Sequence, residues 1–318
     1  LQGIDPVSKR CHFIAHGIGW GVYKRDPANA KNQISLINPT CGYGANMGII
    51  EFYVSSLPGG SLRSKDVLMS ICNDNTTVDC NHILGHMLLV DTEGNLTKAL
   101  EVCKIFQDKQ RRHFCLAGAF MENETATNLV SHGYLPESFL NFPARIDEIE
   151  KLCRSYDGEE AAACWKEIAH AAFFKFNQDP KAIFNFCDTA QTKEGAVLCK
   201  LHSIPEIVPA ENFDLVSLKY MCTLEKNYTF ERNCYSTIIG SALHSIPKNE
   251  IDKVVKFCLT LDGELSDICF AHIGSILKIR EFGRVEIQEI CQTVPLKFRS
   301  KCLSGNINSP QSVGKGID

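Results

Sequence analysis

Two histidine pairs near the N-terminus are the residues of this 318-residue chain best suited to chemistry. His12 and His16 form one HxxxH motif, and His82 and His86 form a second. Residues four apart share one face of a helix, so each pair could bind one metal ion through two imidazoles. Neither motif has the glutamate that follows the first histidine in HExxH zinc proteases, so a metalloprotease is not indicated. We therefore predict two similar metal sites.

Methionines and glutamates follow both motifs and bear on the identity of the metal. Met47 and Glu51 could complete the first site, and Met121 or Glu122 the second. Imidazole with thioether suits copper, whereas imidazole with carboxylate suits zinc or iron. Methionines at helical spacing are also common core residues, so these four side chains are weaker candidates than the histidines. We expect copper, with zinc as the alternative.

The sixteen cysteines form an even set without metal-binding spacing. No CxxC or CxxCH is present, which argues against zinc ribbons, thioredoxin chemistry and c-type haem. Such a set indicates disulfides formed in an oxidising compartment. The cysteines are Cys11, Cys41, Cys72, Cys80, Cys103, Cys115, Cys153, Cys164, Cys187, Cys199, Cys222, Cys234, Cys258, Cys269, Cys291 and Cys302.

The cysteine spacing predicts a repeat. From Cys80 onward, steps of about 23 and about 12 residues alternate and define a unit of about 35 residues. One cysteine lies within the first helix of each unit, and another lies near the end of the second, as in the amphipathic segment 251–258. A two-helix unit cannot bury its apolar face alone, so the units must stack. We predict an all-α fold, an α-solenoid of disulfide-stapled helix pairs.

This period and the helix-pair layout, over residues 72–302, resemble tetratricopeptide and Sel1-like repeats. The cysteine in each helix is similar to those of disulfide-stapled Sel1-like proteins that some bacteria secrete. The usual Trp, Gly, Tyr and Pro signature positions are not recovered. The resemblance therefore implies an architecture and carries no function.

Two disulfide pairings fit the spacing. Bridges across the short steps, such as Cys103–Cys115, use all sixteen cysteines if Cys11 pairs with Cys41. Bridges across the long steps, such as Cys80–Cys103, leave Cys11 and Cys302 unpaired. Both pairings suit an antiparallel helix hairpin, and parity favours the short steps.

The long step between Cys115 and Cys153 indicates an insertion, which includes His132, in an otherwise regular array. Long insertions in repeat proteins often serve binding. We predict one solenoid domain over 1–318. Its parts are His- and Met-rich N-terminal repeats at 1–124, an insertion loop at 125–150, structural repeats at 151–303 and a flexible tail at 304–318.

Composition narrows the function classes. A net charge of -4 gives no argument for nucleic acid, and no apolar run reaches the ~18 residues of a membrane span. The start is neither charged nor apolar, as expected of a mature chain whose export signal has been removed, although a truncated chain would look the same. No phosphate-binding nucleotide loop is present. Sequons at Asn75, Asn95, Asn123 and Asn227 support a glycosylated, extracytoplasmic protein, whether secreted, periplasmic or at the cell surface.

Two functions remain open at this point. The first is an exported copper-binding protein, which could be an oxidoreductase acting on a small molecule. The second is an extracellular scaffold that binds a protein in the groove of the solenoid, with or without homo-oligomerisation.

Overall fold

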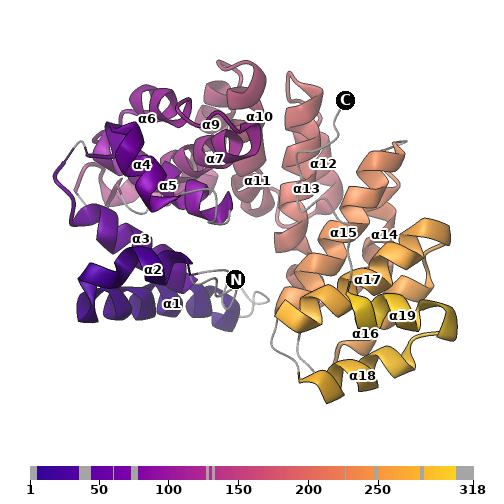
Figure 1. Cartoon of the computed structure of the whole chain (residues 1–318). Helices are drawn as coiled ribbons and strands as arrows, with labels where there is room; N and C mark the ends of the chain where they lie inside the picture. Colours follow the sequence, from indigo (N-terminus) through magenta and orange to yellow (C-terminus); the bar gives the residue numbers. More distant parts are fainter. Residues whose placement is uncertain are drawn as a thin grey trace. The chain divides into compact units, whose positions relative to one another are not determined.

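The chain is all-α in its computed structural model, which describes residues 6–35, 44–59, 61–72, 78–126, 129–130, 133–225, 227–246, 250–279 and 283–305. Throughout these ranges every regular element is a helix, which confirms the fold class (Figure 1). The side chains of residues 6–14, including His12, lie outside the description, as do residues 36–43, 73–77 and 306–318.

Six helix pairs are described in the repeated part, and in all but the last of them the first helix is the shorter. The first helix of each pair ends at or just after a cysteine, and the second carries the next cysteine, as the cysteine period predicts. The six pairs are α6 (Leu96–Cys103) with α7 (Lys109–Thr125), α9 (Ile146–Cys153) with α10 (Gly158–Glu167), α12 (Pro180–Cys187) with α13 (Lys193–Ala210), α14 (Leu215–Cys222) with α15 (Tyr228–Ser245), α16 (Asp252–Leu259) with α17 (Gly263–Ile279), and α18 (Arg284–Thr293) with α19 (Leu296–Ser304).

The disulfides follow the short steps. Seven bridges are described, with Cα–Cα distances from 5.3 to 5.7 Å, and no described cysteine is free. The predicted Cys11–Cys41 bridge lies outside the described residues. Each bridge of this kind stabilises a fold by about 2–4 kcal/mol. The seven are Cys72–Cys80, Cys103–Cys115, Cys153–Cys164, Cys187–Cys199, Cys222–Cys234, Cys258–Cys269 and Cys291–Cys302.

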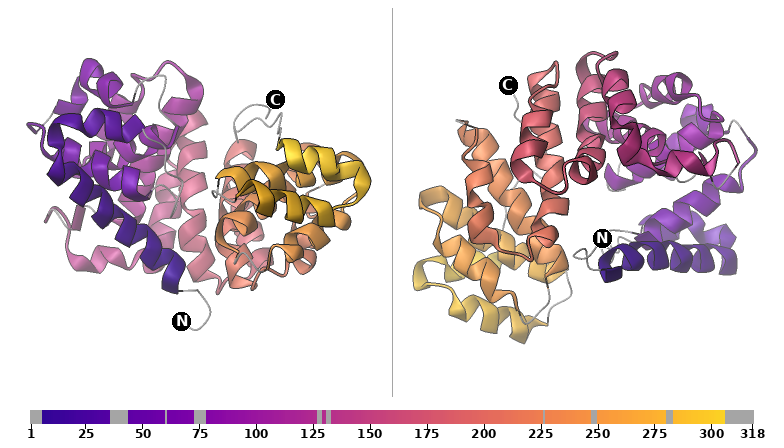
Figure 2. Two further views of the ribbon diagram at one scale, coloured as in Figure 1. Left: turned by 60° about the horizontal axis from the view of Figure 1, so that its bottom comes forward. Right: turned by 180° about the vertical axis from the view of Figure 1, so that it is seen from behind.

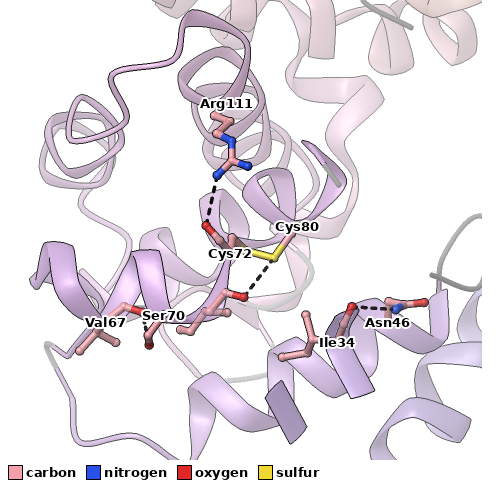
Figure 3. The surroundings of a disulfide bond; sticks show 8 residues. Ile34, Asn46, Val67, Ser70, Cys72, Cys80 and Arg111 are labelled. Carbon is pink, nitrogen blue, oxygen red and sulfur yellow. Dashed lines mark hydrogen bonds between the residues drawn. A yellow bond between two sulfur atoms is a disulfide. The ribbon is translucent and has the colours of Figure 1, made fainter. Parts of the chain in front are cut away.

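The Cys72–Cys80 bridge joins α4 (Lys65–Ile71), through its C-cap residue, to the first turn of α5 (Val78–Asp91). The Arg111 side chain, from α7, donates a hydrogen bond to the Cys72 carbonyl at 3.4 Å (Figure 3). Because α7 is itself bridged to α6, this bond links two successive disulfide-stapled helix pairs.

The chain divides into two compact units, where the period predicts one continuous array. The first unit holds Pro6–Lys175 and Phe186–Cys199, and the second holds Phe176–Asn185 and the chain from Lys200 onward. In the second unit the second helices of successive pairs pack in sequence, α15 on α17 and α17 on α19 (Figure 2). This stacking of neighbouring helix pairs is the packing of α-solenoid repeats. Both histidine motifs lie in the first unit.

The first unit begins with α1 (Pro6–Arg25), a 3-10 turn η1 (Pro27–Asn29), α2 (Ala30–Ser35) and α3 (Gly44–Ser55). A second 3-10 turn, η2 (Ser61–Arg63), precedes α4. In this unit α1 packs on α3, α5 packs on α7, and α7 packs on α10.

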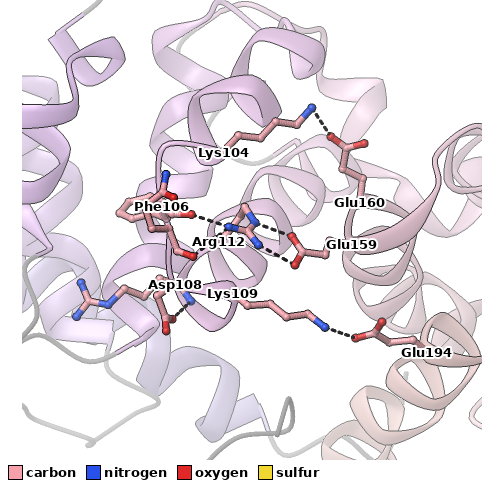
Figure 4. Close-up of polar contacts among 10 residues, drawn as sticks. Lys104, Phe106, Asp108, Lys109, Arg112, Glu159, Glu160 and Glu194 are labelled. Carbon is pink, nitrogen blue, oxygen red and sulfur yellow. Dashed lines mark hydrogen bonds and ion pairs between the residues drawn. The ribbon is translucent and has the colours of Figure 1, made fainter. Parts of the chain in front are cut away.

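Ion pairs join the end of α6 and the first turns of α7 to later repeats (Figure 4). The Arg112 guanidinium donates to both carboxylate oxygens of Glu159, at 2.6 and 2.9 Å, and Lys104 pairs with Glu160 at 3.1 Å. Glu159 and Glu160 lie in the first turn of α10, where negative charge is also stabilised by the helix dipole. The outer pair, Lys109 with Glu194 on α13, is looser at 4.0 Å.

The insertion is shorter than predicted. Two 3-10 turns, η3 (Glu137–Leu140) and η4 (Phe142–Arg145), are followed by α9, so residues 146–150 already belong to a regular repeat helix. In η4 the Phe142 ring stacks on His170 of α11 (Ala169–Lys175), with ring centroids 4.9 Å apart. His132 lies outside the described residues. No helix in the described ranges is long and apolar enough to cross a membrane.

Candidate metal centre

The second histidine motif occupies one side of α5. Ile83, Leu84 and Leu88 are buried on this helix, while His82 and His86 are half-buried. The Nε2 atoms of the two histidines lie 3.2 Å apart, with their rings nearly edge to face. One turn of helix therefore brings two imidazole nitrogens together, as the HxxxH spacing predicts.

Glu122 holds the second of these imidazoles from the neighbouring helix α7. Its Oε2 lies 3.1 Å from Nδ1 of His86, and its Oε1 accepts the backbone N–H of Leu129 at 3.0 Å. The side chain is only 1% exposed. A carboxylate held in this way favours the tautomer in which Nδ1 of His86 carries the proton, so the Nε2 lone pair points towards His82.

The separation of the two Nε2 atoms fits a shared metal ion. Zinc and copper bind imidazole nitrogen at about 2.0–2.1 Å, and a tetrahedral angle then separates two such nitrogens by about 3.3 Å. The observed separation is 3.2 Å. Histidine ligands usually donate their other ring N–H to a carboxylate, which is the relation of His86 to Glu122.

The imidazole nitrogens of His82 and His86 converge at this point. Across the described residues, no group of three or more His, Cys, Asp or Glu side chains could hold a metal ion. Since Glu122 already contacts His86 and Leu129, its geometry suits an orienting partner rather than a direct ligand. Within the described ranges, a third protein ligand would therefore be a residue other than His, Cys, Asp or Glu.

The first motif shows a related contact. Nδ1 of His16 on α1 lies 3.0 Å from Oε2 of Glu51 on α3, and both side chains are about one-fifth exposed. The partner in this motif, His12, is outside the described side chains. The first pair of helices therefore provides one imidazole and one carboxylate.

Glycines set how each pair of helices crosses. A Cβ on Gly48 would lie 2.2 Å from the His16 carbonyl oxygen, and a Cβ on Gly118 would lie 1.8 Å from that of His82. In the same way, Gly19 abuts the backbone of α3, and Gly85 abuts the backbone of α7. The two crossings are built alike, with His16 at the place of His82.

The glycine contacts decide how the two histidine motifs correspond. In the sequence, His12 lies one residue after Cys11 and His82 lies two residues after Cys80, a spacing that would align the two motifs. The glycine contacts instead shift the first motif by one helical turn. The residue of α1 that matches His86 is then Trp20, which stacks on Phe52 with ring centroids 5.2 Å apart. The cysteine period starts at Cys80, so it does not govern the first helix pair.

The methionines have different surroundings. Met121 precedes Glu122 on α7 and is half-buried, as is Met47 on α3. Met87, by contrast, is 3% exposed and belongs to the core. Met121 is adjacent in sequence to Glu122, the residue of α7 that contacts His86.

A group of buried charges beside α7 was not predicted from the sequence. Glu124 and Glu167 are both 1% exposed. Burial and then the charge of Glu167 raise the pKa of Glu124 well above its usual range, outweighing the Ala171 N–H and Arg145. Burial and Lys166 lower the pKa of His113 to about 4, so this histidine is uncharged at neutral pH. In the sequence, the signal for this buried group is the pair of acidic residues Glu122 and Glu124, which lie two positions apart.

Three of the four sequons fall on described residues. Asn95 is the N-cap of α6 and accepts the Lys98 N–H, and Asn227 is the N-cap of α15 and accepts the N–H groups of Thr229 and Phe230. Asn123 lies inside α7 and is half-buried. Asn75 is outside the described residues.

Comparison with known proteins does not extend this picture, because no protein-family model, curated protein or solved structure matches the chain.

Proposed function

We propose that this chain is an extracytoplasmic metal-binding repeat protein that uses His82 and His86 as ligands, with copper as the favoured ion. The observation that carries the proposal is the 3.2 Å separation of the two Nε2 atoms beside a carboxylate that orients one ring.

The disulfides support the proposed extracytoplasmic compartment. Seven bridges within the described residues are typical of proteins that fold under oxidising conditions, outside a reducing cytosol. Secretion, a periplasmic location and glycosylation are part of our proposal. We also propose that the chain is related to Sel1-like repeat proteins. The stacked helix pairs support this relation at the level of architecture.

Metal content tests the proposal. The chain should be purified without an affinity tag, analysed for bound elements, and titrated with Cu and Zn. We expect about one tight ion per chain at this site, lost in the double variant His82→Ala/His86→Ala. His202→Ala is the matched control, because His202 is a half-buried histidine of the second unit and should leave binding intact. A wild-type chain that is empty and ignores both added metals would overturn the proposal.

An enzymatic role would build on the same site. Two protein nitrogens leave coordination positions open on a copper ion, which is the condition for reaction with a small molecule. Oxygen uptake by the copper-loaded chain with an added organic reductant is the relevant assay, and the copper-free chain is its control.

One observation favours the scaffold alternative. Val216, Tyr220 and Leu224 recur at intervals of four residues along α14 and beyond its end, and each is 44–52% exposed. An exposed apolar ridge of this kind is typical of interaction surfaces. If it joins two copies of the chain, sedimentation should show concentration-dependent association that Tyr220→Ser removes and His82→Ala/His86→Ala preserves. A monomer at all concentrations would count against self-association.

A further inference from the structure

We infer that Met121 supplies a thioether ligand next to His82, so that the site between α5 and α7 prefers Cu(I). This inference rests on the proposed metal-binding function. It names the third donor and the oxidation state of the ion.

The two helix crossings correspond residue by residue. Gly48 and Gly118 meet the carbonyl oxygens of His16 and His82, so the two helices of each pair approach each other in the same way. The neighbouring contacts agree, because Gly19 meets the backbone of Ala45 and Ile49, and Gly85 meets that of Cys115 and Ala119. On α3 and α7 the corresponding residues are therefore Ala45 with Cys115, Gly48 with Gly118, and Ile49 with Ala119.

Two positions beside each helix crossing bring side chains of the two helices together. In the α1–α3 pair, Glu51 contacts His16 and the next residue, Phe52, stacks on Trp20 one turn further along. In the α5–α7 pair, the counterpart of the second contact is present, as Glu122 reaches His86.

In the α5–α7 pair, Met121 and His82 occupy the places of Glu51 and His16. Residue 121 occupies the place of Glu51, and Glu51 reaches its histidine at 3.0 Å. Since the matching second contact is observed, the same crossing directs residue 121 towards His82. Met121 is also half-buried rather than enclosed in the core.

The chemistry of the three donor atoms, two imidazole nitrogens and one thioether sulfur, determines which metal ion the site prefers. Two imidazoles and one thioether form a soft, three-donor site, and soft sulfur ligands select Cu(I) over harder ions such as Zn(II). The sulfur cannot come from cysteine here, because every described cysteine is bridged. The α1–α3 pair has a carboxylate at the matching place, so it should not share this preference.

Competition titration tests the inference. Wild type and Met121→Leu are titrated anaerobically with Cu(I), and separately with Zn(II), against a chelator of known affinity. Loss of a carboxylate partner costs about 10–100-fold in metal affinity, so loss of a direct ligand should weaken Cu(I) binding by at least about tenfold. Zn(II) binding should change by less than about twofold, because the two imidazoles that hold it are kept. Met69→Leu is the matched control, because Met69 is a half-buried methionine of α4 with no place in either histidine motif, and it should leave both affinities unchanged.

X-ray absorption of the Cu(I)-loaded wild type gives a second readout that needs no variant. We expect a sulfur scatterer in addition to nitrogen. A wild type that binds neither ion would overturn the proposed function together with the inference. Binding that depends on His82 and His86, with unchanged Cu(I) affinity in Met121→Leu and no sulfur in the spectrum, would overturn the inference alone.

Discussion

Oε2 of Glu122 on α7 lies 3.1 Å from Nδ1 of His86 on α5. The two residues are 36 positions apart in the chain, so the contact exists only because α5 and α7 pack closely. A buried carboxylate with one oxygen on an imidazole and the other on a backbone N–H has a fixed orientation, and it fixes that of the imidazole.

Glu122→Gln should weaken metal binding while preserving the fold. The amide oxygen can still accept the Leu129 N–H, which places the amide NH2 against Nδ1 of His86. His86 must then carry its proton on Nε2, the atom that a metal needs free. We expect about 10–100-fold weaker binding in a competition titration, with near wild-type thermal unfolding of the metal-free chain. Unchanged affinity would show that Glu122 does not act through His86.

Gly19→Ala and Gly21→Ala should have opposite effects, although both positions lie on α1. A Cβ on Gly19 would lie 2.0 Å from the Ala45 carbonyl oxygen, whereas a Cβ on Gly21 has no atom within 4 Å. Overpacking at the first position should destabilise the chain by about 1–3 kcal/mol or more. Alanine at the second should stabilise it by about 0.5–1 kcal/mol, because glycine is entropically costly in a helix. Thermal and denaturant unfolding measure both, and equal effects would contradict the close crossing.

Glu124→Gln should change how stability depends on pH. The folded-state pKa of Glu124 is raised, so its contribution is complete below about pH 4.5 and is lost as pH rises through the folded value. The glutamine side chain does not titrate. The unfolding free energy of the variant should therefore increase relative to that of wild type as pH rises from about 5 to 8.

Glu159→Gln is the matched control for this pH series. Arg112 lowers the pKa of Glu159, so this carboxylate stabilises the fold above its unfolded pKa and loses that effect as pH falls. Its glutamine variant should therefore lose stability relative to wild type at neutral pH. A constant difference between wild type and Glu124→Gln at every pH would contradict the buried-carboxylate assignment.

Asn95 and Asn227 should carry N-linked glycans when the chain passes through a eukaryotic secretory pathway. In both residues Oδ1 accepts the capping hydrogen bonds, which leaves Nδ2, the atom that bonds the sugar, outside the cap. Asn123 lies within α7 and is half-buried, so it should be much less occupied. Glycopeptide mass spectrometry measures occupancy at each site. High occupancy at Asn123, with Asn95 and Asn227 empty, would reverse this assignment.

The cysteines show how far local spacing predicts the fold. Partners such as Cys103 and Cys115 are 12 residues apart, so the end of one helix and the start of the next determine their distance. The helix pairs and the disulfide pairing could therefore be derived from the sequence. Division into two units could not, because it depends on packing between residues far apart in the chain.

The candidate site was found from His82 and His86, which share a helix face by spacing alone. The role of Glu122 could not be predicted from the sequence. Its position predicted a metal ligand, whereas in the structure it contacts Nδ1 of His86, the ring nitrogen that faces away from His82. The buried Glu124 and Glu167 gave little sequence signal, since burial of a carboxylate depends on the helices that cover it.

The sequence by itself determined an all-α, disulfide-stapled chain of helix pairs with an imidazole pair at His82 and His86, because these features arise from residues close together in the chain. Only the tertiary structure decided which residues of α1 and α3 correspond to those of α5 and α7. That register is set where Gly19, Gly48, Gly85 and Gly118 let helix backbones touch, and backbone contact between separate helices has no counterpart in local spacing.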